Sequence, residues 1–529
     1  MRFDKGTIGS VLETVSKEYS DRTAIIFEDV SVSYKEIHRK SNIVACNLWN
    51  QGIRKDDKVA VLLPNCLEYF YIYYALFIIG AWIVPINTRY EKDEIKRIFK
   101  DGDVGTIIYK NKIGVFNYDS ILSDINAELP MLKKFISTKA IDNKKRILLV
   151  DLFKENCDMK GFMDYLIKNP VEPDNVAILG YTSGTTGIPK GVMILHENLV
   201  KTSIHEGVIM DLGKDVGFSI APMYAAQGFN AILIYMTSGI TMKWISTFNP
   251  TDIITHIVKK RVNALHTQPT MWSLLLSLPY FQYVFFKNLD KVIVSGSLCS
   301  PNLAKRIEKS TGCKLVNIYG LIESTGVVTS THLDDPVDVR INTVGRPIDG
   351  VQIKIVDNNR KEVPKGEVGE LAVKGYLMKG YYKNKEKTDE VIDDNGWLYT
   401  GDLASYYKDG ENICIVGRLK DMIIRGGFNV YPIDIEECLL GFGKVLDIAV
   451  VAKEDEILGE SIVAYVIPKP GEEIEKTEIL KYCRGKISNY KVPDEVVFVS
   501  QFPILDSGKV QKNILQQWTK SQVPEEYRV

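Results

Sequence analysis

The residues with the clearest chemistry lie between Tyr181 and Gly191, a segment that reads Tyr-Thr-Ser-Gly-Thr-Thr-Gly-Ile-Pro-Lys-Gly. Its glycines let the backbone approach a ligand closely, and its hydroxyl and amide N–H groups can point at anionic oxygens. Lys190 adds a compact positive charge suited to phosphate. A short apolar run, 176–181, precedes the segment. The pattern therefore predicts a strand, a phosphate-binding loop and then a helix from Val192.

This phosphate loop, residues 181–191, is not a Walker A motif. That motif requires G-x-x-x-x-G-K-[ST], whereas Lys190 is preceded by Pro189 and followed by Gly191. A P-loop kinase or GTPase is therefore disfavoured. Most short Gly/Ser/Thr clusters are flexible surface loops, but the apolar strand that leads into this one favours a nucleotide-phosphate site.

Further candidates for nucleotide recognition follow in order along the chain. Tyr319 can stack on a purine, Asn317 can offer a donor and an acceptor to an adenine edge, and Glu323 is a hard oxygen ligand suited to Mg²⁺. Asp402, after the Gly401 turn, can accept hydrogen bonds from both ribose hydroxyls, although an aspartate there can also simply cap a turn.

The elements that must position these residues alternate between strand and helix patterns. Thr23–Phe27 and Val59–Leu63 are predicted strands, Tyr34–Gln51 is a predicted helix, and the alternation continues through 190–330, which indicates βαβ units on mostly parallel sheets. Tyr69–Ile86 is uncharged; we interpret it as a buried helix to Ile79, a turn at Gly80 and a strand, in preference to a membrane span.

The pattern changes after residue 344. Strand-like runs separated by Gly, Pro and Asp predict a small antiparallel or barrel-like subdomain over 344–416, and a fresh helix–strand module follows. We place a domain boundary near 418, giving domains 1–418 and 419–529. The predicted elements of the second half are Val351–Val356, Gly369–Val373, Asn412–Val416, Pro432–Leu440, Val445–Ala452, Ile462–Ile467, Glu475–Cys483 and Val496–Val499.

Taken in order, these motifs resemble those of the adenylate-forming, or AMP-binding, superfamily over nearly the whole chain. The resemblance implies an α/β fold: a large N-terminal domain of βαβ subdomains plus a small barrel-like subdomain, then a small mobile α+β C-terminal domain. The form Gly426-Gly-Phe-Asn-Val-Tyr-Pro432 is similar to that of acyl- and aryl-CoA ligases. Residues 223–227 include no acid to hold an α-ammonium group, which also favours a non-amino-acid carboxylate.

The resemblance implies a two-step reaction that uses ATP, Mg²⁺ and a thiol. Lys509, in a loop near the C-terminus, serves the transition state that forms acyl-AMP; Glu323 holds Mg²⁺, and Lys420 is the interdomain hinge. The thiol belongs to coenzyme A or to the phosphopantetheine of an acyl or aryl carrier protein. Its side of the site is Gly426, Gly427, Phe428 and Asn429.

The resemblance also assigns nucleotide and substrate contacts. The nucleotide contacts are Thr182, Ser183, Gly184, Thr185, Thr186, Gly187, Lys190, Ser297, Leu298, Cys299, Asn317, Ile318, Tyr319, Gly320, Asp402 and Arg418. The acyl pocket, whose lining is neutral and largely apolar, is Tyr224, Ala225, Gln227, Val294, Ser297, Ile318, Gly320, Gly326 and Val327. The chain departs from the family pattern at Ala225, usually His, and at Ile322, usually Thr.

Composition limits the other classes of function. The chain has 529 residues, 45% of them apolar, and a formal net charge of −1, so nothing indicates a nucleic-acid partner. The eight cysteines form no metal-ligand pattern and the N-terminus has no signal peptide, so we expect a cytoplasmic enzyme. A homodimer stays open. A luciferase-type oxygenase has no specific support, and a non-catalytic nucleotide sensor is disfavoured because the motif set is intact.

Overall fold

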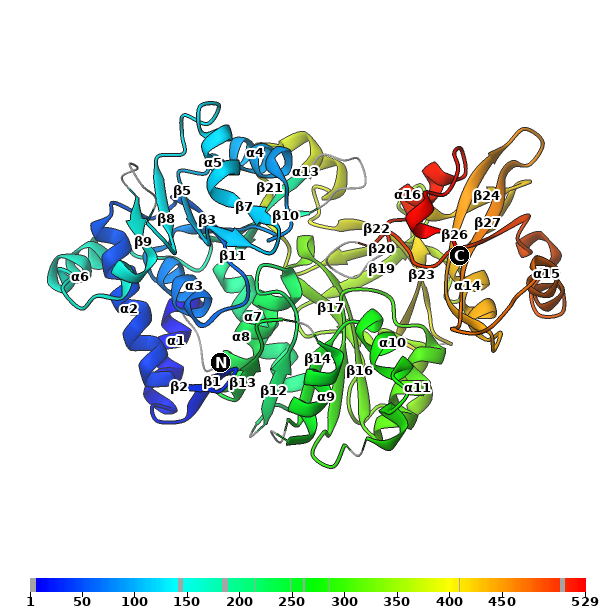
Figure 1. Ribbon diagram of the computed structural model, residues 1–529, viewed down its shortest axis with the longest axis horizontal. Helices are drawn as coiled ribbons and strands as arrows, with labels where there is room; N and C mark the ends of the chain where they lie inside the picture. The colour runs from blue at the N-terminus through cyan, green and yellow to red at the C-terminus, as the bar shows by residue number, and fades with distance from the viewer. Residues whose placement is uncertain are drawn as a thin grey trace.

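The computed structural model describes residues 6–140, 146–182, 189–213, 215–247, 249–259, 262–284, 286–408, 410–504 and 510–529. Within these ranges the strands form sheets of eight, nine, four and five strands and a two-stranded ribbon, β6 (Lys112–Ile113) with β7 (Phe116–Asn117). Figure 1 shows the C-terminal residues, orange to red, as a separate unit beside a larger body. The architecture is therefore a large α/β domain followed by a small one, as predicted.

The first sheet carries the phosphate loop. It is parallel from β10 to β9, and β11 and β21 extend it with antiparallel pairs. Its order is β21 (Gly380–Tyr381), β11 (Lys190–Leu195), β10 (Val176–Thr182), β4 (Trp82–Pro85), β3 (Lys58–Leu62), β5 (Thr106–Tyr109), β8 (Lys134–Ser137) and β9 (Ile147–Leu148).

The prediction of a helix from Val192 was wrong. Residues 190–195 form strand β11, antiparallel to β10 with Gly180 opposite Val192, and the helix α7 begins only at His196. A short apolar run fits a strand and a helix equally well on periodicity alone. The unpaired edge of β10 decides between them, because β11 satisfies its backbone groups.

The second sheet is also mostly parallel. Its pairs are parallel from β1 to β16, and antiparallel pairs add β2 at one edge and β17 and β18 at the other. Its order is β18 (Arg346–Pro347), β17 (Gly326–Ser330), β16 (Lys314–Leu321), β15 (Lys291–Val294), β14 (Ala264–Thr267), β12 (Val216–Ser219), β13 (Thr241–Trp244), β1 (Thr23–Phe27) and β2 (Val30–Ser33).

Helices separate and cover these two sheets, giving the layer order helix, sheet, helix, sheet, helix. The outer layers are α4 (Lys92–Asp101) and α5 (Tyr118–Asn126) on the first sheet, and α9 (Pro250–Lys259), α10 (Pro269–Ser277) and α11 (Pro301–Thr311) on the second. The middle layer is α1 (Ile8–Glu18), α2 (Tyr34–Asn50), α3 (Leu67–Ile79), α7 (His196–Ile209) and α8 (Ala226–Ser238).

Helix α3 confirms the interpretation of the uncharged segment. Its tyrosines and most of its aliphatic residues are buried, and Gly80 ends it with a φ of 80° before strand β4. Only a residue without a Cβ adopts that left-handed conformation readily. No helix in the described ranges is long and apolar enough to cross a membrane.

The third sheet joins the large domain to the small one. It is antiparallel and open, with the order β19 (Gln352–Val356), β20 (Gly369–Lys374), β22 (Leu398–Tyr406) and β23 (Ile413–Arg418). The antiparallel subdomain was thus predicted correctly, in the form of a sheet. Two short helices, α12 (Val337–Asn342) and α13 (Lys385–Val391), flank this region, and α6 (Met159–Lys168) packs beside α2.

The C-terminal domain has its own sheet and core. Its strands are β25 (Phe428–Val430), β24 (Ile423–Arg425), β27 (Gly459–Pro468), β26 (Val445–Asp455) and β28 (Glu495–Phe498), and its helices are α14 (Pro432–Leu440), α15 (Lys476–Arg484) and α16 (Lys512–Trp518). The predicted strands and helices of this half are all present, with shifts at their ends.

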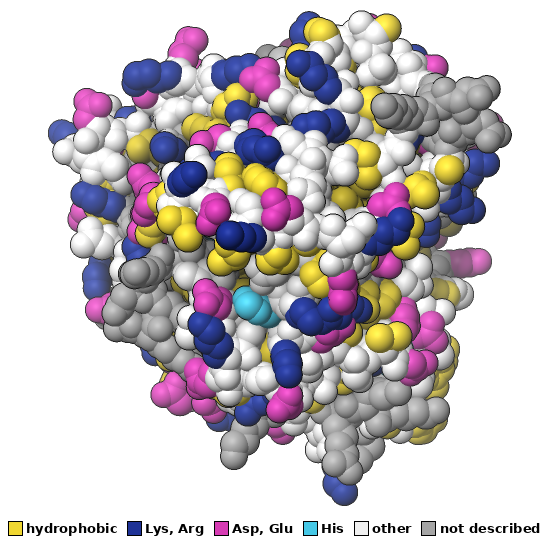
Figure 2. Space-filling model, turned by 90° about the vertical axis from the view of Figure 1, so that its left-hand side faces the viewer, with side chains coloured by type: hydrophobic (Ala, Val, Ile, Leu, Met, Phe, Trp, Pro, Cys, Tyr) yellow, Lys and Arg dark blue, Asp and Glu magenta, His cyan; other side chains and the backbone are white. Residues whose placement is uncertain are grey.

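The molecular surface is mixed in charge where Figure 2 presents it. Lys and Arg side chains are interspersed with Asp and Glu, and no continuous field of one sign covers this face. This distribution agrees with a formal net charge of −1.

Candidate active site

One cavity of about 2220 Å³ lies where the three sheets of the large domain meet the C-terminal domain. It collects residues that are hundreds of positions apart in the sequence. Fifteen of the predicted site residues line it: Lys190, Tyr224, Ala225, Gln227, Ser297, Leu298, Ile318, Tyr319, Gly320, Glu323, Gly326, Val327, Asp402, Arg418 and Lys420.

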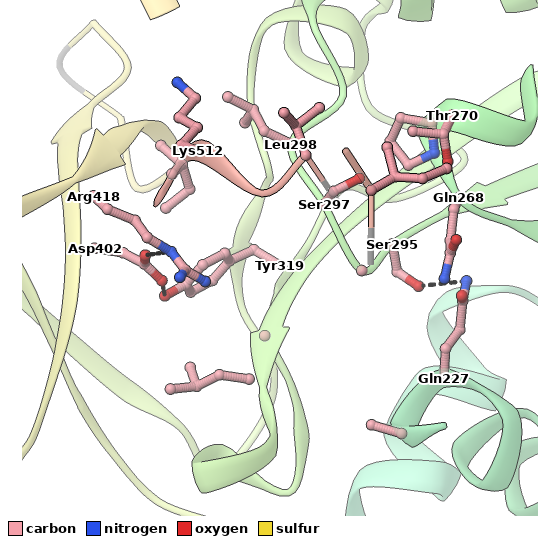
Figure 3. A pocket seen from close by; sticks show the side chains of 18 of the residues that line it. Gln227, Gln268, Thr270, Ser295, Ser297, Leu298, Tyr319, Asp402, Arg418 and Lys512 are labelled. Atoms are coloured by element: carbon pink, nitrogen blue, oxygen red, sulfur yellow. Dashed lines mark hydrogen bonds and ion pairs between the residues drawn. The ribbon is translucent and has the colours of Figure 1, made fainter. Parts of the chain in front are cut away.

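A triad of side chains, linked by a hydrogen bond and an ion pair, joins the second and third sheets at this cavity (Figure 3). The Tyr319 hydroxyl donates to Asp402 Oδ2 at 2.7 Å, and Arg418 Nε lies 3.5 Å from Asp402 Oδ1. Asp402 and Arg418 are opposite each other in the register of β22 and β23. Burial, together with the neighbouring Asp402 carboxylate, raises the pKa of Tyr319 well above its ordinary value. Tyr319 therefore remains a neutral donor that orients the carboxylate.

A second cluster includes Lys190, from the predicted phosphate loop. Glu323 lies in the short 3₁₀ helix Ile322–Ser324 that follows β16, and its Oε1 accepts a hydrogen bond from the Tyr381 hydroxyl at 3.1 Å. Lys190 Nζ sits 4.9 Å from the centre of the Tyr381 ring, a cation–π contact. Tyr381 thus holds a cation and a carboxylate on the same side of the cavity.

Part of the predicted phosphate loop and the predicted catalytic lysine lie outside the described residues. These positions are Ser183, Gly184, Thr185, Thr186, Gly187 and Lys509. Thr182 is the last residue of β10. On either side of 505–509, Ile504 and Val510 form an antiparallel bridge and both line the cavity.

Ile322, which stands where the family pattern usually has Thr, packs over Gly180. A Cβ added to Gly180 would lie 2.5 Å from Ile322 Cδ1, so the isoleucine side chain fills the space above the glycine of β10. Ile322 also packs against the main core while lining the cavity. The side chain therefore joins the first sheet to the end of β16.

The predicted acyl side of the cavity is built on the start of α8. Gln227 Nε2 donates to the Thr267 carbonyl at 2.9 Å and to Ser295 Oγ at 3.1 Å (Figure 3). Ser295 Oγ also lies 2.9 Å from His266 Nε2, and burial lowers the pKa of His266 to about 4, so its imidazole is neutral. This network fixes the Gln227 side chain. Ala225 is the N-cap residue of α8 and leaves the space of a larger side chain open.

Three predicted contacts do not reach the cavity. Val294 is fully buried in the core of the second sheet. Cys299 is 4% exposed, and burial raises the pKa of its thiol to about 12. Asn317 Nδ2 donates to the Thr343 carbonyl at 3.0 Å, so this amide is engaged within the protein. Their neighbours Ser297, Leu298 and Ile318 do line the cavity.

The predicted thiol side also lies elsewhere in this arrangement of the domains. Gly426 and Gly427 form the turn of the β24–β25 hairpin, and Phe428 is 57% exposed and stacks on Tyr490 with ring centres 4.9 Å apart. None of the residues 426–429 lines the cavity. The C-terminal domain instead presents the ion pair of Lys512 and Glu436, 2.7 Å apart.

Lys420 connects the two domains. It lies in the short 3₁₀ helix Leu419–Asp421, between β23 of the third sheet and β24 of the C-terminal sheet, and it lines the cavity. Its Nζ is 4.0 Å from Asp421 Oδ1, and burial lowers its pKa although Asp421 opposes the shift.

Several cavity residues were not predicted from the sequence, and one of them is a buried acid. Glu206, near the end of α7, is 4% exposed and lines the cavity. Burial raises the pKa of its carboxyl to about 8. The signal was present: an acidic residue stands in a helix between Ile204 and Val208, one turn after the buried Thr202 and Ser203.

Comparisons with known proteins agree with this geometry. The profile of the AMP-binding enzyme family matches residues 12–382, and that of the AMP-binding enzyme C-terminal domain matches residues 434–509. The chain therefore belongs to the AMP-binding enzyme family, as its motifs predicted.

Its relatives and a solved structure extend over the same length. YngI of Bacillus subtilis (strain 168), provisionally assigned as an acyl-CoA synthetase, is 34% identical over 537 residues, 97% of each chain. The mitochondrial medium-chain acyl-CoA ligase of Homo sapiens is 30% identical, covering 96% of this chain and 86% of the relative. ATP-bound MatB from Rhodopseudomonas palustris superposes with a TM-score of 0.87 at 26% identity, covering 97% and 99% of the two chains.

Proposed function

We propose that this protein is an AMP-forming ligase that activates a non-amino-acid carboxylic acid with ATP and then joins it to coenzyme A. The observation that carries the proposal is the single cavity that holds Lys190 and Glu323 on one side and the Tyr319–Asp402–Arg418 triad on another. The names of the relatives, acyl-CoA synthetase and acyl-CoA ligase, support the same reaction.

In the first half-reaction a carboxylate oxygen attacks the α-phosphorus of ATP. The bond from that phosphorus to the bridging oxygen breaks, and pyrophosphate leaves. We assign the β- and γ-phosphates to Lys190 and the loop 182–187, and the ribose to Asp402 and Arg418. We assign Lys509 to the transition state, where a positioned cation can neutralise charge on both the entering and the leaving oxygens.

The cluster around Glu323 fits a magnesium ion. Only Oε1 of its carboxylate is engaged by the Tyr381 hydroxyl, and the residue faces the cavity. Mg²⁺ is commonly bound by one or two protein carboxylates together with substrate phosphates. The ion, when bound, would offset the negative charge of the triphosphate, while Tyr381 orients the carboxylate that holds it.

In the second half-reaction the thiol sulfur attacks the acyl carbon, the thiol gives up its proton, and the bond to AMP breaks. We propose that residues 1–418 and 419–529 move as two bodies about Lys420 between the half-reactions. The location of Gly426–Asn429 outside the present cavity supports this movement, because these residues must be brought to the site to meet the thiol. This arrangement of the domains suits the first half-reaction.

The identity of the acceptor and the compartment are parts of the same proposal. Coenzyme A agrees with the names of the relatives, and a carrier-protein phosphopantetheine is the alternative. A comparison of free coenzyme A with purified acyl or aryl carrier proteins separates the two. All eight cysteines are free thiols, which supports a reducing, cytoplasmic setting.

The decisive experiment separates the two half-reactions. A hydroxamate-trapping screen over a library of carboxylic acids finds a substrate, and Lys509→Ala is then assayed with it. We expect the variant to lose adenylation, measured by ATP–pyrophosphate exchange, and to keep thioester formation from preformed acyl-AMP. An equal loss in both steps would remove Lys509 from its assigned role.

A further inference from the structure

A buried carboxyl group stands in the wall of the acyl side of the cavity. Glu206 is 4% exposed and lines the cavity, and within the described part of the chain no hydrogen bond or ion pair reaches its side chain. It also lies in the last turn of α7, His196–Ile209, where the helix dipole disfavours a negative charge. The Glu206 side chain therefore does not stabilise its own helix, and another reason for its position is needed.

Contacts between helices place Glu206 beyond the start of α8. The Thr202 hydroxyl lies 3.5 Å from the Thr325 carbonyl, and a Cβ added to the next residue, Gly326, would lie 2.4 Å from Asn230 Nδ2. Thr202 of α7 is thus level with Asn230 of α8. Glu206 follows Thr202 by one helical turn, about 6 Å further along α7.

The two helices run in the same direction at this point. A Cβ added to Gly207 would lie 2.4 Å from the Ser238 hydroxyl, so the end of α7 meets the end of α8. Gln227 precedes Asn230 by three residues and shares its face of α8. The order along the two helices is therefore Gln227, then Asn230, then Glu206, with all three on the cavity lining.

These side chains present acceptors that lack donors. Gln227 Oε1 and Asn230 Oδ1 are buried without a hydrogen-bond partner in the described ranges, while Gln227 Nε2 is already committed to Thr267 and Ser295. Buried acceptors are normally satisfied, and a group left unpaired opposes burial. Both oxygens are enclosed, so a donor on a bound ligand would satisfy them once the side chains turn toward the cavity, whereas a plain alkyl chain would leave them unpaired.

The nearby charged groups do not supply such a donor. Glu206 has no cation paired with it among the described residues, and burial raises the pKa of its carboxyl to about 8. An amine entering the cavity would draw the carboxyl into its ionised form, and a hydroxyl could donate to it directly. The walls around this polar end are apolar, with Phe229 and Val327 among them.

We propose that Glu206, with Gln227 and Asn230, selects carboxylic acids that carry an amino or hydroxyl group at the end remote from the reacting carboxylate, and therefore no α-ammonium group. This inference rests on the proposed function, since it names the substrate class for the same site. A site built to pair a polar group discriminates strongly against the analogue that lacks it.

The test compares matched acids of the same chain length that end in a methyl, hydroxyl or amino group. Wild type, Glu206→Gln and Glu206→Leu are assayed by ATP–pyrophosphate exchange, and binding of each acid is measured by calorimetry. Glu197→Gln is the matched control, because Glu197 is an acid of the same helix that is ion-paired with Lys201. We expect wild type and the control to prefer a substituted acid by about tenfold or more in kcat/KM.

The variants then distinguish the contributions of charge and hydrogen bonding. Glu206→Leu should reverse the preference, and Glu206→Gln should retain acids with a hydroxyl end and lose those with an amino end. The inference is overturned if wild type uses the methyl-ended acids with an equal or higher kcat/KM and Glu206→Leu shows the same order of acids. The proposed ligase reaction would stand in that case.

Binding keeps this test separate from that of the reaction itself. If none of the acids supports exchange but calorimetry shows the same preference in wild type and its loss in Glu206→Leu, the inference stands and the ligase proposal fails. If the acids bind equally or not at all, the inference is wrong.

Discussion

Replacing Glu206 by Gln should change how the stability of the large domain depends on pH. Burial raises the pKa of this carboxyl from 4.5 to about 8 in the folded protein. Between those values the folded protein keeps a proton that the unfolded chain has lost. The free energy of unfolding therefore falls as the pH rises through this window. The glutamine of the Glu206→Gln variant cannot ionise, so the free energy of unfolding of this variant does not fall in that way.

The size of the effect follows from the shift. For each pH unit within the window, the free energy of unfolding of wild type falls by at most about 1.4 kcal/mol because of Glu206. Between pH 5 and pH 7.5 the stability of Glu206→Gln relative to wild type should increase by about 3 kcal/mol. A difference of this size is large beside the marginal stability of a folded domain.

Urea unfolding followed by tryptophan fluorescence measures this difference at a series of pH values. Trp244 and Trp272 are fully buried in the large domain, so their emission reports its unfolding. Glu197→Gln, on the same helix, is the control for replacing a glutamate that is ion-paired. The reasoning is refuted if the Glu206→Gln difference is constant over this pH range, because Glu206 would then be ionised, and stabilised, in the folded protein.

Three further predictions concern the other parts of the site. Gly180→Ala places a methyl group 2.5 Å from Ile322 Cδ1 and should lower the free energy of unfolding by about 1–3 kcal/mol. Ile322→Val lacks that atom, so the double variant should regain most of the lost stability. If the two substitutions have additive effects in urea unfolding, the contact is contradicted. Tyr319→Phe removes the 2.7 Å hydrogen bond to Asp402 and should raise the KM for ATP by about five- to tenfold with a smaller change in kcat, so an unchanged KM would exclude the triad from nucleotide binding. Lys420→Pro should spare ATP–pyrophosphate exchange and slow thioester formation in a rapid-quench assay, whereas normal overall turnover would rule out the hinge.

The sequence alone determined the features that depend on local patterns. The buried helix that ends at Gly80 and the strands and helices of the C-terminal domain were all predicted. Each of them follows from residue type, glycine conformation or hydrophobic spacing within a short window. The family could be predicted for a related reason, because its motifs occur in a fixed order along the chain.

The tertiary structure decided what depends on pairing between distant segments. Residues 192–195 became a strand because β10 offered an unpaired edge. Asn317 turned to the Thr343 carbonyl, while its neighbour Ile318 lines the cavity. Whether a segment pairs as a strand, and which way its side chains face, depends on where its partner lies. Hydrophobic spacing gives no information on the position of that partner.

The same holds for the site as a whole. Tyr319 and Asp402 are 83 positions apart and meet only because the second and third sheets adjoin. Glu206 is one of several polar residues of its helix, and only the packing of α7 beside α8 places it in the cavity. The sequence therefore determined the chemistry of nucleotide activation, carried by contiguous motifs. The fold alone determined the polar end of the proposed acyl pocket, because its polar groups come from separate helices that only packing brings together.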